Sequence, residues 1–150
     1  RAAVAVAAAV AVLAVGAGAV VEEQRVRDAR QQSTQAERIE AVLAAPDAVV
    51  HTATGPGGTG RVTLVVSRSR DEAVAVLGGL PSPGVDRAYQ LWLVDGAQSA
   101  TSTGLLGPGM AGGTVLVEGL RGEQSFAVTN EPAHGSPRPT TDQFGRIELA

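Results

Sequence analysis

The stretch that decides the fold reads AYQLWLVDG and spans residues 88–96. It holds the only tyrosine and the only tryptophan of the chain. In an extended strand, alternate side chains point to opposite faces, so Tyr89 and Leu91 share one face while Gln90 and Trp92 share the other. Both faces are largely apolar, which is typical of a central strand. We expect Trp92 to be a core anchor, because one indole supplies a large buried area; stacking on a ligand is the alternative.

Short segments of strand character lie on both sides of this stretch, separated by turns rich in Gly, Pro, Ser and Asp. Apolar and polar residues alternate most clearly over Arg61–Ser67. Residues 55–58 are glycine-rich and favour a hairpin between that segment and Val49–Thr54. The other candidates are Ala73–Leu77, Ala100–Leu106, Thr114–Glu118 and Ser125–Asn130. About seven strands without intervening helical patterns predict an all-β domain over residues 46–150, an antiparallel β-sandwich or barrel, of which we expect the sandwich.

The N-terminal part of the chain has a different character. Residues 2–21 form an unbroken run of Ala, Val, Gly and one Leu that ends at Glu22. As a helix, such a run reaches about 30 Å, the thickness of a bilayer's hydrocarbon core. We therefore expect a transmembrane helix over residues 1–21, with a marginal insertion free energy of about −3 kcal/mol. The alternatives are a signal peptide, with Ala17-Gly18-Ala19 as its cleavage site, and a buried soluble helix.

Residues 22–45 are charged, favour helix and contain neither glycine nor proline. We expect a helical juxtamembrane stalk that continues the span into water. A heptad spacing runs through it but includes Ser33 and Glu40, so a solvated stalk is preferred over a weak dimer contact. Three apolar side chains are expected to dock its end onto the following domain: Ile39, Val42 and Leu43.

The composition excludes several kinds of chemistry. A formal net charge of −3 gives no basic surface for nucleic acid. The absence of cysteine excludes disulfides, thiolate metal sites and cysteine nucleophiles. A zinc site would need the only two histidines, His51 and His134, to converge with a carboxylate such as Asp47 or Glu131. No short ligand spacing supports this, so we expect no metal site. Ser136 lacks the flanking glycine of a nucleophile elbow, and Pro137 removes the next backbone N–H, so we expect no enzyme activity and no cofactor.

A loop between Glu131 and Thr141 contains three prolines, which restrict the backbone and favour extended or polyproline conformations. Such a rigid polar loop fits a partner-recognition surface, or a cover that seals one end of the sandwich. The carboxylate of Glu131 is placed to cap backbone N–H groups within it. The candidate partner-recognition residues are Glu131, Pro132, His134, Ser136, Pro137 and Arg138.

Two of these segments resemble the extracytoplasmic C-terminal domain of anti-sigma-K factors, which are membrane-bound regulators of alternative sigma factors. The first reads YQLWLVDG at residues 89–96, and the second reads AVTNEPAHGSPRPTT at residues 127–141. Support comes from LAAPDA at residues 43–48 and GLP at residues 79–81. The pieces occur in the family's order and cover the chain from residue 43 onward.

The resemblance implies a single-pass protein of the cell membrane, with the β domain outside and a sigma factor bound by an N-terminal cytoplasmic domain absent from this chain. It further implies cleavage by a site-1 protease outside the membrane and then by an intramembrane protease. Gly16 and Gly18 would ease the second cut, because each glycine weakens a helix by about 1 kcal/mol; the alternative is that glycines are simply common in membrane helices. The implied partners are therefore membrane lipid, the sigma factor and the two proteases.

A second hypothesis uses the same fold differently. It describes a membrane-anchored or secreted β-sandwich binding module for an envelope ligand or protein. A short helical cytoplasmic domain upstream favours the regulator, whereas an immediate initiator methionine with a basic segment favours the binding module.

Overall fold

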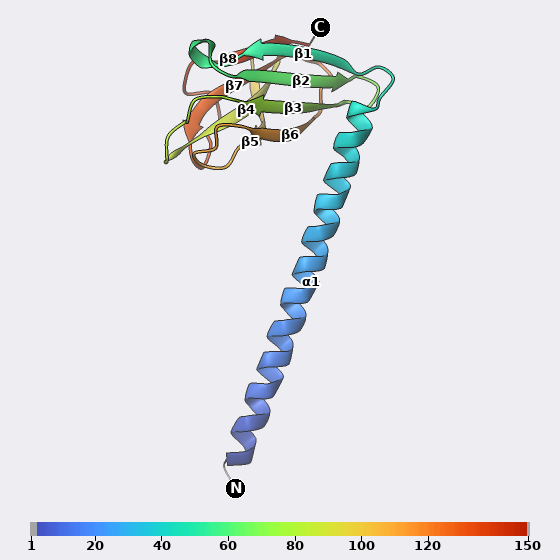
Figure 1. Cartoon of the computed structure of the whole chain (residues 1–150), viewed down its shortest axis with the longest axis vertical. Helices are drawn as coiled ribbons and strands as arrows, with labels where there is room; N and C mark the ends of the chain where they lie inside the picture. The colour runs from blue at the N-terminus through green and yellow to red at the C-terminus, as the bar shows by residue number, and fades with distance from the viewer. Residues whose placement is uncertain (1–2, 150) are drawn as a thin grey trace. The chain divides into compact units, whose positions relative to one another are not determined.

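A computed structural model describes the backbone of residues 3–149 and the side chains of residues 21–149. The chain separates into two compact units, Arg1–Glu37 and Arg38–Ala150. The helix α1 (Ala3–Leu43) accounts for nearly all of the first unit and ends within the second (Figure 1). Among the residues described in full, no helical segment has the length and apolar character of a bilayer span. The predicted span, with Gly16 and Gly18, lies outside those residues except for Val21, and it stays a prediction.

The stalk segment is helical as far as Leu43, two residues short of the predicted end. Its side chains from residue 21 to residue 37 are all exposed. Arg27 pairs with Glu23 at 2.6 Å, one turn apart, a surface contact worth only a few tenths of a kcal/mol. Pro46 follows the last helical turn and cannot continue it, which explains where the helix ends.

The second unit is built from two antiparallel sheets of four strands each, with eight strands in total (Figure 1). The first sheet contains β1 (Val49–Thr54), β2 (Arg61–Ser67), β3 (Glu72–Gly78) and β6 (Gly113–Glu118), in the order β1-β2-β3-β6. The second contains β4 (Arg87–Asp95), β5 (Ala100–Leu105), β7 (Glu123–Pro132) and β8 (Phe144–Glu148), in the order β5-β4-β7-β8. The antiparallel all-β prediction for this unit is confirmed.

Two details of that prediction change. The expected hairpin between β1 and β2 is present, and its glycine-rich turn contains a short 3-10 helix, η1 (Pro56–Gly58). The count of about seven strands is wrong by one, because β8 was not recognised. That strand buries only Gly145 and Ile147, too few apolar positions to give a readable alternation.

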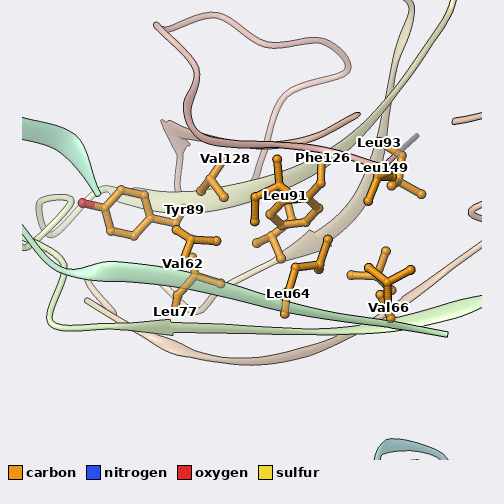
Figure 2. Close-up of a cluster of buried hydrophobic side chains, with 14 of the residues drawn as sticks. Val62, Leu64, Val66, Leu77, Tyr89, Leu91, Leu93, Phe126, Val128 and Leu149 are labelled. Atoms are coloured by element: carbon orange, nitrogen blue, oxygen red, sulfur yellow. The ribbon is translucent and has the colours of Figure 1, made fainter. Parts of the chain in front are cut away.

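The core lies between the two sheets (Figure 2). Tyr89 and Leu91 of β4 pack there against inward side chains of the opposite sheet, such as Val62 and Leu64 of β2. Strand β4 is central in its sheet, as predicted, and pairs with β5 and β7. Along the sides of the sandwich β1 lies beside β8, and β5 beside β6, so the two sheets meet at both edges.

The opposite face of β4 is also buried. Trp92 is fully buried, as predicted, and its indole N–H donates to the Thr129 hydroxyl at 2.8 Å. It does not belong to the core between the sheets, however. In the register of β4 and β7, Trp92 shares the outer face with Gln90 and Glu131, which carry polar contacts to the loop after β7. That loop therefore forms a partial third layer over the outer face.

Candidate functional site

Glu131 lies at the end of β7 and is completely buried. One carboxylate oxygen accepts the backbone N–H of Thr140 at 2.9 Å, and the other accepts the Ser136 hydroxyl at 2.8 Å. The Thr140 hydroxyl also donates to it. Burial alone would raise the pKa of Glu131, but the donors from Thr140, Thr129 and Ser136 outweigh it and lower the pKa to about 2. A buried carboxylate thus holds the loop through hydroxyl and amide groups.

Gln90 fixes the same loop from the neighbouring strand. Its side-chain amide donates to the Ser136 carbonyl at 3.0 Å and accepts the Ser136 N–H at 2.8 Å. Gly135 precedes this contact with a φ of 78°. A Cβ on Gly135 would lie 3.2 Å from the Gln90 side-chain oxygen, so both the backbone angle and the close approach favour glycine there.

The six candidate recognition residues fall into two groups. Glu131 and Ser136 are brought together and hold the loop, and Pro132 is half-buried beside them. The other three are exposed to solvent: His134, Pro137 and Arg138. The loop is thus held against the outer face of β4 and β7. That it seals one end of the sandwich, and that its exposed residues recognise a partner, both stay predictions.

A second proline-rich loop, residues 79–86, is tied to the same region. The Arg87 guanidinium donates to the Asn130 side-chain oxygen at 2.8 Å, and the Asn130 amide donates to the Pro83 carbonyl at 3.1 Å. Tyr89 donates its hydroxyl to the Pro81 carbonyl at 2.9 Å. Sequence reasoning did not identify Arg87 or Asn130, because the pairing of β4 with β7 that brings them together cannot be read from local patterns.

A separate polar cluster lies where α1 enters the β domain, and it was also missed. Arg38 donates from Nε to Glu72 at 2.9 Å and from Nη2 to both Glu72 and Glu118. Arg70 adds a contact to the second Glu72 oxygen at 3.1 Å. Hydrogen bonding to Arg38 lowers the pKa of Glu72 against the effect of burial, and the contacts to Glu118 and Glu72 raise the pKa of Arg38. We call these four residues the junction cluster.

Asp47 anchors the connector, residues 44–48, which joins α1 to β1. This carboxylate accepts the Ser69 N–H at 2.8 Å and the hydroxyls of Ser67 and Ser69 at 2.9 Å. The Ser69 N–H, followed by the two hydroxyls, lowers the pKa of Asp47 to about 2. Asp47 therefore fixes the connector to the β2–β3 turn.

The three apolar residues expected to dock the end of the stalk behave differently from one another. Val42 is fully buried and Ile39 is half-buried, in line with the prediction. Leu43 is 52% exposed, so its assignment as a docking residue is wrong. It follows Val42 by one residue, and the turn of about 100° between them points Leu43 to solvent while Val42 is buried.

No metal centre emerges from the described residues. Within residues 21–149, no three His, Asp or Glu side chains gather in a way that would hold a metal ion. A polar hollow of about 510 Å³ lies at the β1–β2 turn, and its walls are Thr52, Ala53, Thr54, Gly58, Gly60 and Arg61. The contacts that organise the domain are instead the Glu131 loop and the junction cluster.

Comparison with known proteins identifies the family. Residues 3–144 match the family model described as anti-sigma-K factor RskA, C-terminal. An uncharacterized protein in the phr 5' region of Streptomyces griseus is 40% identical over 137 residues, which cover 88% of this chain and 57% of that protein. The anti-sigma-K factor RskA of Mycobacterium ulcerans (strain Agy99) is 38% identical over 112 residues, 73% of this chain and 47% of the relative. The anti-sigma-K factor RskA of Mycobacterium sp. (strain KMS) is 38% identical over 150 residues, which cover 97% of this chain and 58% of that protein.

The chain spans about half the length of the curated relatives it matches. No solved structure matches it. The family match extends from the helix through nearly all of the β-sandwich and includes both segments that carry the resemblance, YQLWLVDG and AVTNEPAHGSPRPTT. The chain therefore belongs to the anti-sigma-K factor family and corresponds to its RskA C-terminal domain.

Proposed function

We propose that this chain is the membrane-spanning and extracytoplasmic part of an anti-sigma factor that restrains an alternative sigma factor. The observation that carries the proposal is the family match over residues 3–144, which covers a helix followed by the β-sandwich. The part of the relatives that this chain does not match leaves room for a cytoplasmic domain that binds the sigma factor. In this role the protein is a regulator and catalyses no reaction.

The proposed arrangement places the protein in the cell membrane with a single span. The apolar run at residues 2–21 supports it by length, since about 20 residues of helix cross a bilayer's hydrocarbon core. The polar segment that follows, residues 22–37, is exposed along its described length, as a stalk in water requires. The β-sandwich then lies outside the cytoplasm.

We further propose that proteolysis controls the regulator. A site-1 protease cuts outside the membrane, and an intramembrane protease then releases the cytoplasmic part with its sigma factor. Gly16 and Gly18 are the candidate positions at which the span is weak enough to be unwound. In this scheme the β domain controls whether the first protease reaches its substrate.

The test uses the full-length protein in its native membrane, with an epitope tag at each end. In intact protoplasts, added protease should remove the C-terminal tag and spare the N-terminal tag. Deleting residues 46–150 should change both the cleavage pattern and the sigma-dependent transcription. A matched control replaces the same residues with an unrelated folded domain. It separates a specific gating role of the β domain from steric blocking by any folded domain at this position. Unchanged cleavage and transcription after the deletion would rule out the gating role.

A second candidate function is the binding of an envelope ligand or protein by the β domain. The supporting observation is the loop after β7, in which Glu131 and Gln90 hold the backbone while His134, Pro137 and Arg138 are exposed. A preorganised loop loses little conformational entropy on binding. Replacing the three exposed residues with alanine in the tagged protein should abolish a response to envelope conditions and leave the resting level of the protein unchanged. An intact response in that variant would exclude this surface as the binding site.

A further inference from the structure

Glu72 and Glu118 are cross-strand partners in the register of β3 and β6. Like charges placed directly opposite each other on two strands destabilise the pairing. The structure resolves this conflict with Arg38, which contacts both carboxylates although it lies 34 residues from one and 80 from the other. Arg38 therefore links the end of α1 to the end of the β3–β6 pair, and the pairing of the two acidic residues depends on this link.

The contact is stronger than an ordinary surface ion pair. The Glu72 side chain is only 11% exposed and that of Arg38 is 36% exposed, so solvent screens the pair only in part. Two guanidinium nitrogens take part, which gives charge-assisted hydrogen bonds of fixed geometry. Val42 lies one helical turn after Arg38 and is fully buried. The same face of α1 thus carries an ionic anchor and an apolar anchor.

The segment after these anchors is accessible yet held in place. Residues 43, 44 and 46 are exposed, and Leu43 is the largest apolar side chain among them. Its conformation is helix and turn, with the Ala44 N–H bonded to the Glu40 carbonyl at 2.9 Å. Asp47 fixes the far side of this segment to the β2–β3 turn. Residues 43–46 are therefore bounded by Arg38 and Val42 on one side and by Asp47 on the other.

Endoproteases bind their substrates as extended segments, so a helical turn must open locally before it can be cut. We infer that Arg38, Glu72 and Glu118 form a latch that keeps residues 38–48 closed to an endoprotease, and that release of this latch makes residues 43–48 the cleavable segment. The assignment of this cut to the site-1 step rests on the proposed function. The latch itself is a property of the chain and can be tested without a membrane or a sigma factor.

The experiment is limited proteolysis of the purified chain in detergent, with subtilisin as a protease of broad specificity and mass spectrometry to map the cuts. The Arg38→Gln variant should be cut within residues 38–48 about tenfold faster than the parent, in line with the loss of charge-assisted hydrogen bonds. Arg38→Lys keeps the charge but loses the forked geometry, and it should give an intermediate rate. The matched control is Arg27→Gln, which removes the same charge from an exposed helical pair with Glu23 and should leave the rate in this segment unchanged.

Hydrogen exchange of the backbone amides at residues 40–46 provides a second measurement. It should accelerate in Arg38→Gln and not in Arg27→Gln. If Arg38→Gln does not fold, Glu118→Gln removes one partner whose side chain is 62% exposed, and should accelerate the same cut to a smaller extent. Equal rates in the Arg38 and Arg27 variants, or faster cuts confined to other segments, would overturn the latch. The purified chain can show the latch even if the full-length protein is not cleaved in cells. The latch and the proposed regulated proteolysis are therefore tested separately.

Discussion

Gln90 holds the backbone of Ser136 at both its donor and its acceptor, 46 residues along the chain. Gln90 lies on the central strand β4, and Ser136 lies in the loop that follows β7. The side chain is buried, so water cannot replace either bond without cost. This pair therefore couples the position of the candidate recognition loop to the most buried strand of the domain.

Replacing Gln90 with methionine should destabilise the domain by about 1–3 kcal/mol, because the backbone N–H and carbonyl of the half-buried Ser136 then lose their partner. Chemical denaturation followed by circular dichroism measures the change. The matched control is Gln143→Met at an exposed loop position, which should stay within about 0.5 kcal/mol of the parent. Equal stability of the two variants would show that the Gln90 bonds contribute little.

The stability of the domain should fall as the pH drops from about 4.5 towards 2. The folded-state pKa of Glu131 is lowered from 4.5 to about 2, so the ionised form contributes stability that is present above the unfolded pKa and lost as the pH falls through the folded one. For this buried group the contribution is about 3 kcal/mol. Glu131→Gln should be less stable at neutral pH and show a shallower acid dependence in denaturation experiments.

Asp47 titrates in the same range, since its pKa is also lowered to about 2, and it must be separated from Glu131. Asp47→Asn removes the contribution of the connector and leaves that of the loop. The double variant with Glu131→Gln should therefore show the flattest dependence below pH 4.5. An acid dependence that survives in the double variant would assign the effect to other carboxylates.

Gly135→Ala should lower the thermal stability of the domain. Its φ of 78° disfavours a side chain, and the added Cβ would lie 3.2 Å from Gln90 and 3.4 Å from Leu105. We expect a loss of about 1–2 kcal/mol. Gly78→Ala is the matched control, because no heavy atom lies within 4 Å of its added Cβ and its φ is not positive. A calorimetric melt that ranks the two variants in the opposite order would contradict the close approach described for Gly135.

The exposed residues of the loop should be dispensable for folding. His134→Ala and Arg138→Ala should each change the free energy of unfolding by less than about 0.5 kcal/mol. Any loss of function in these variants would then reflect a lost contact with a partner. A large loss of stability would instead show that these side chains help to hold the loop.

The sequence was most informative where structure follows from local pattern. Alternation in Arg61–Ser67 and the two apolar faces of β4 predicted a sandwich strand and a central strand, because side-chain direction in a strand depends only on position along it. The same reasoning failed for β8, which has few apolar residues and depends on pairing with β7. It predicted correctly that Trp92 is buried. Local alternation does not say, however, which face of a strand meets the second sheet.

The contacts of the candidate sites also divide into those that the local sequence reveals and those that depend on which strands pair. The prolines and Glu131 of the loop were visible because they are close together in the sequence. The junction cluster was invisible, since Arg38 meets Glu72 and Glu118 only after β3 has paired with β6. Glu118 ends one predicted strand and Glu72 directly precedes another, but nothing local indicated that the two strands are neighbours.

Trp92 gives the molecule a built-in optical reporter. It is the only tryptophan, it is fully buried, and it shares the outer face of its sheet with the residues that hold the loop. A dry indole bonded to a threonine hydroxyl emits at shorter wavelengths than one in water. A red shift in the emission would therefore register the lifting of that outer layer, by a ligand or by a pull on the chain, without any label.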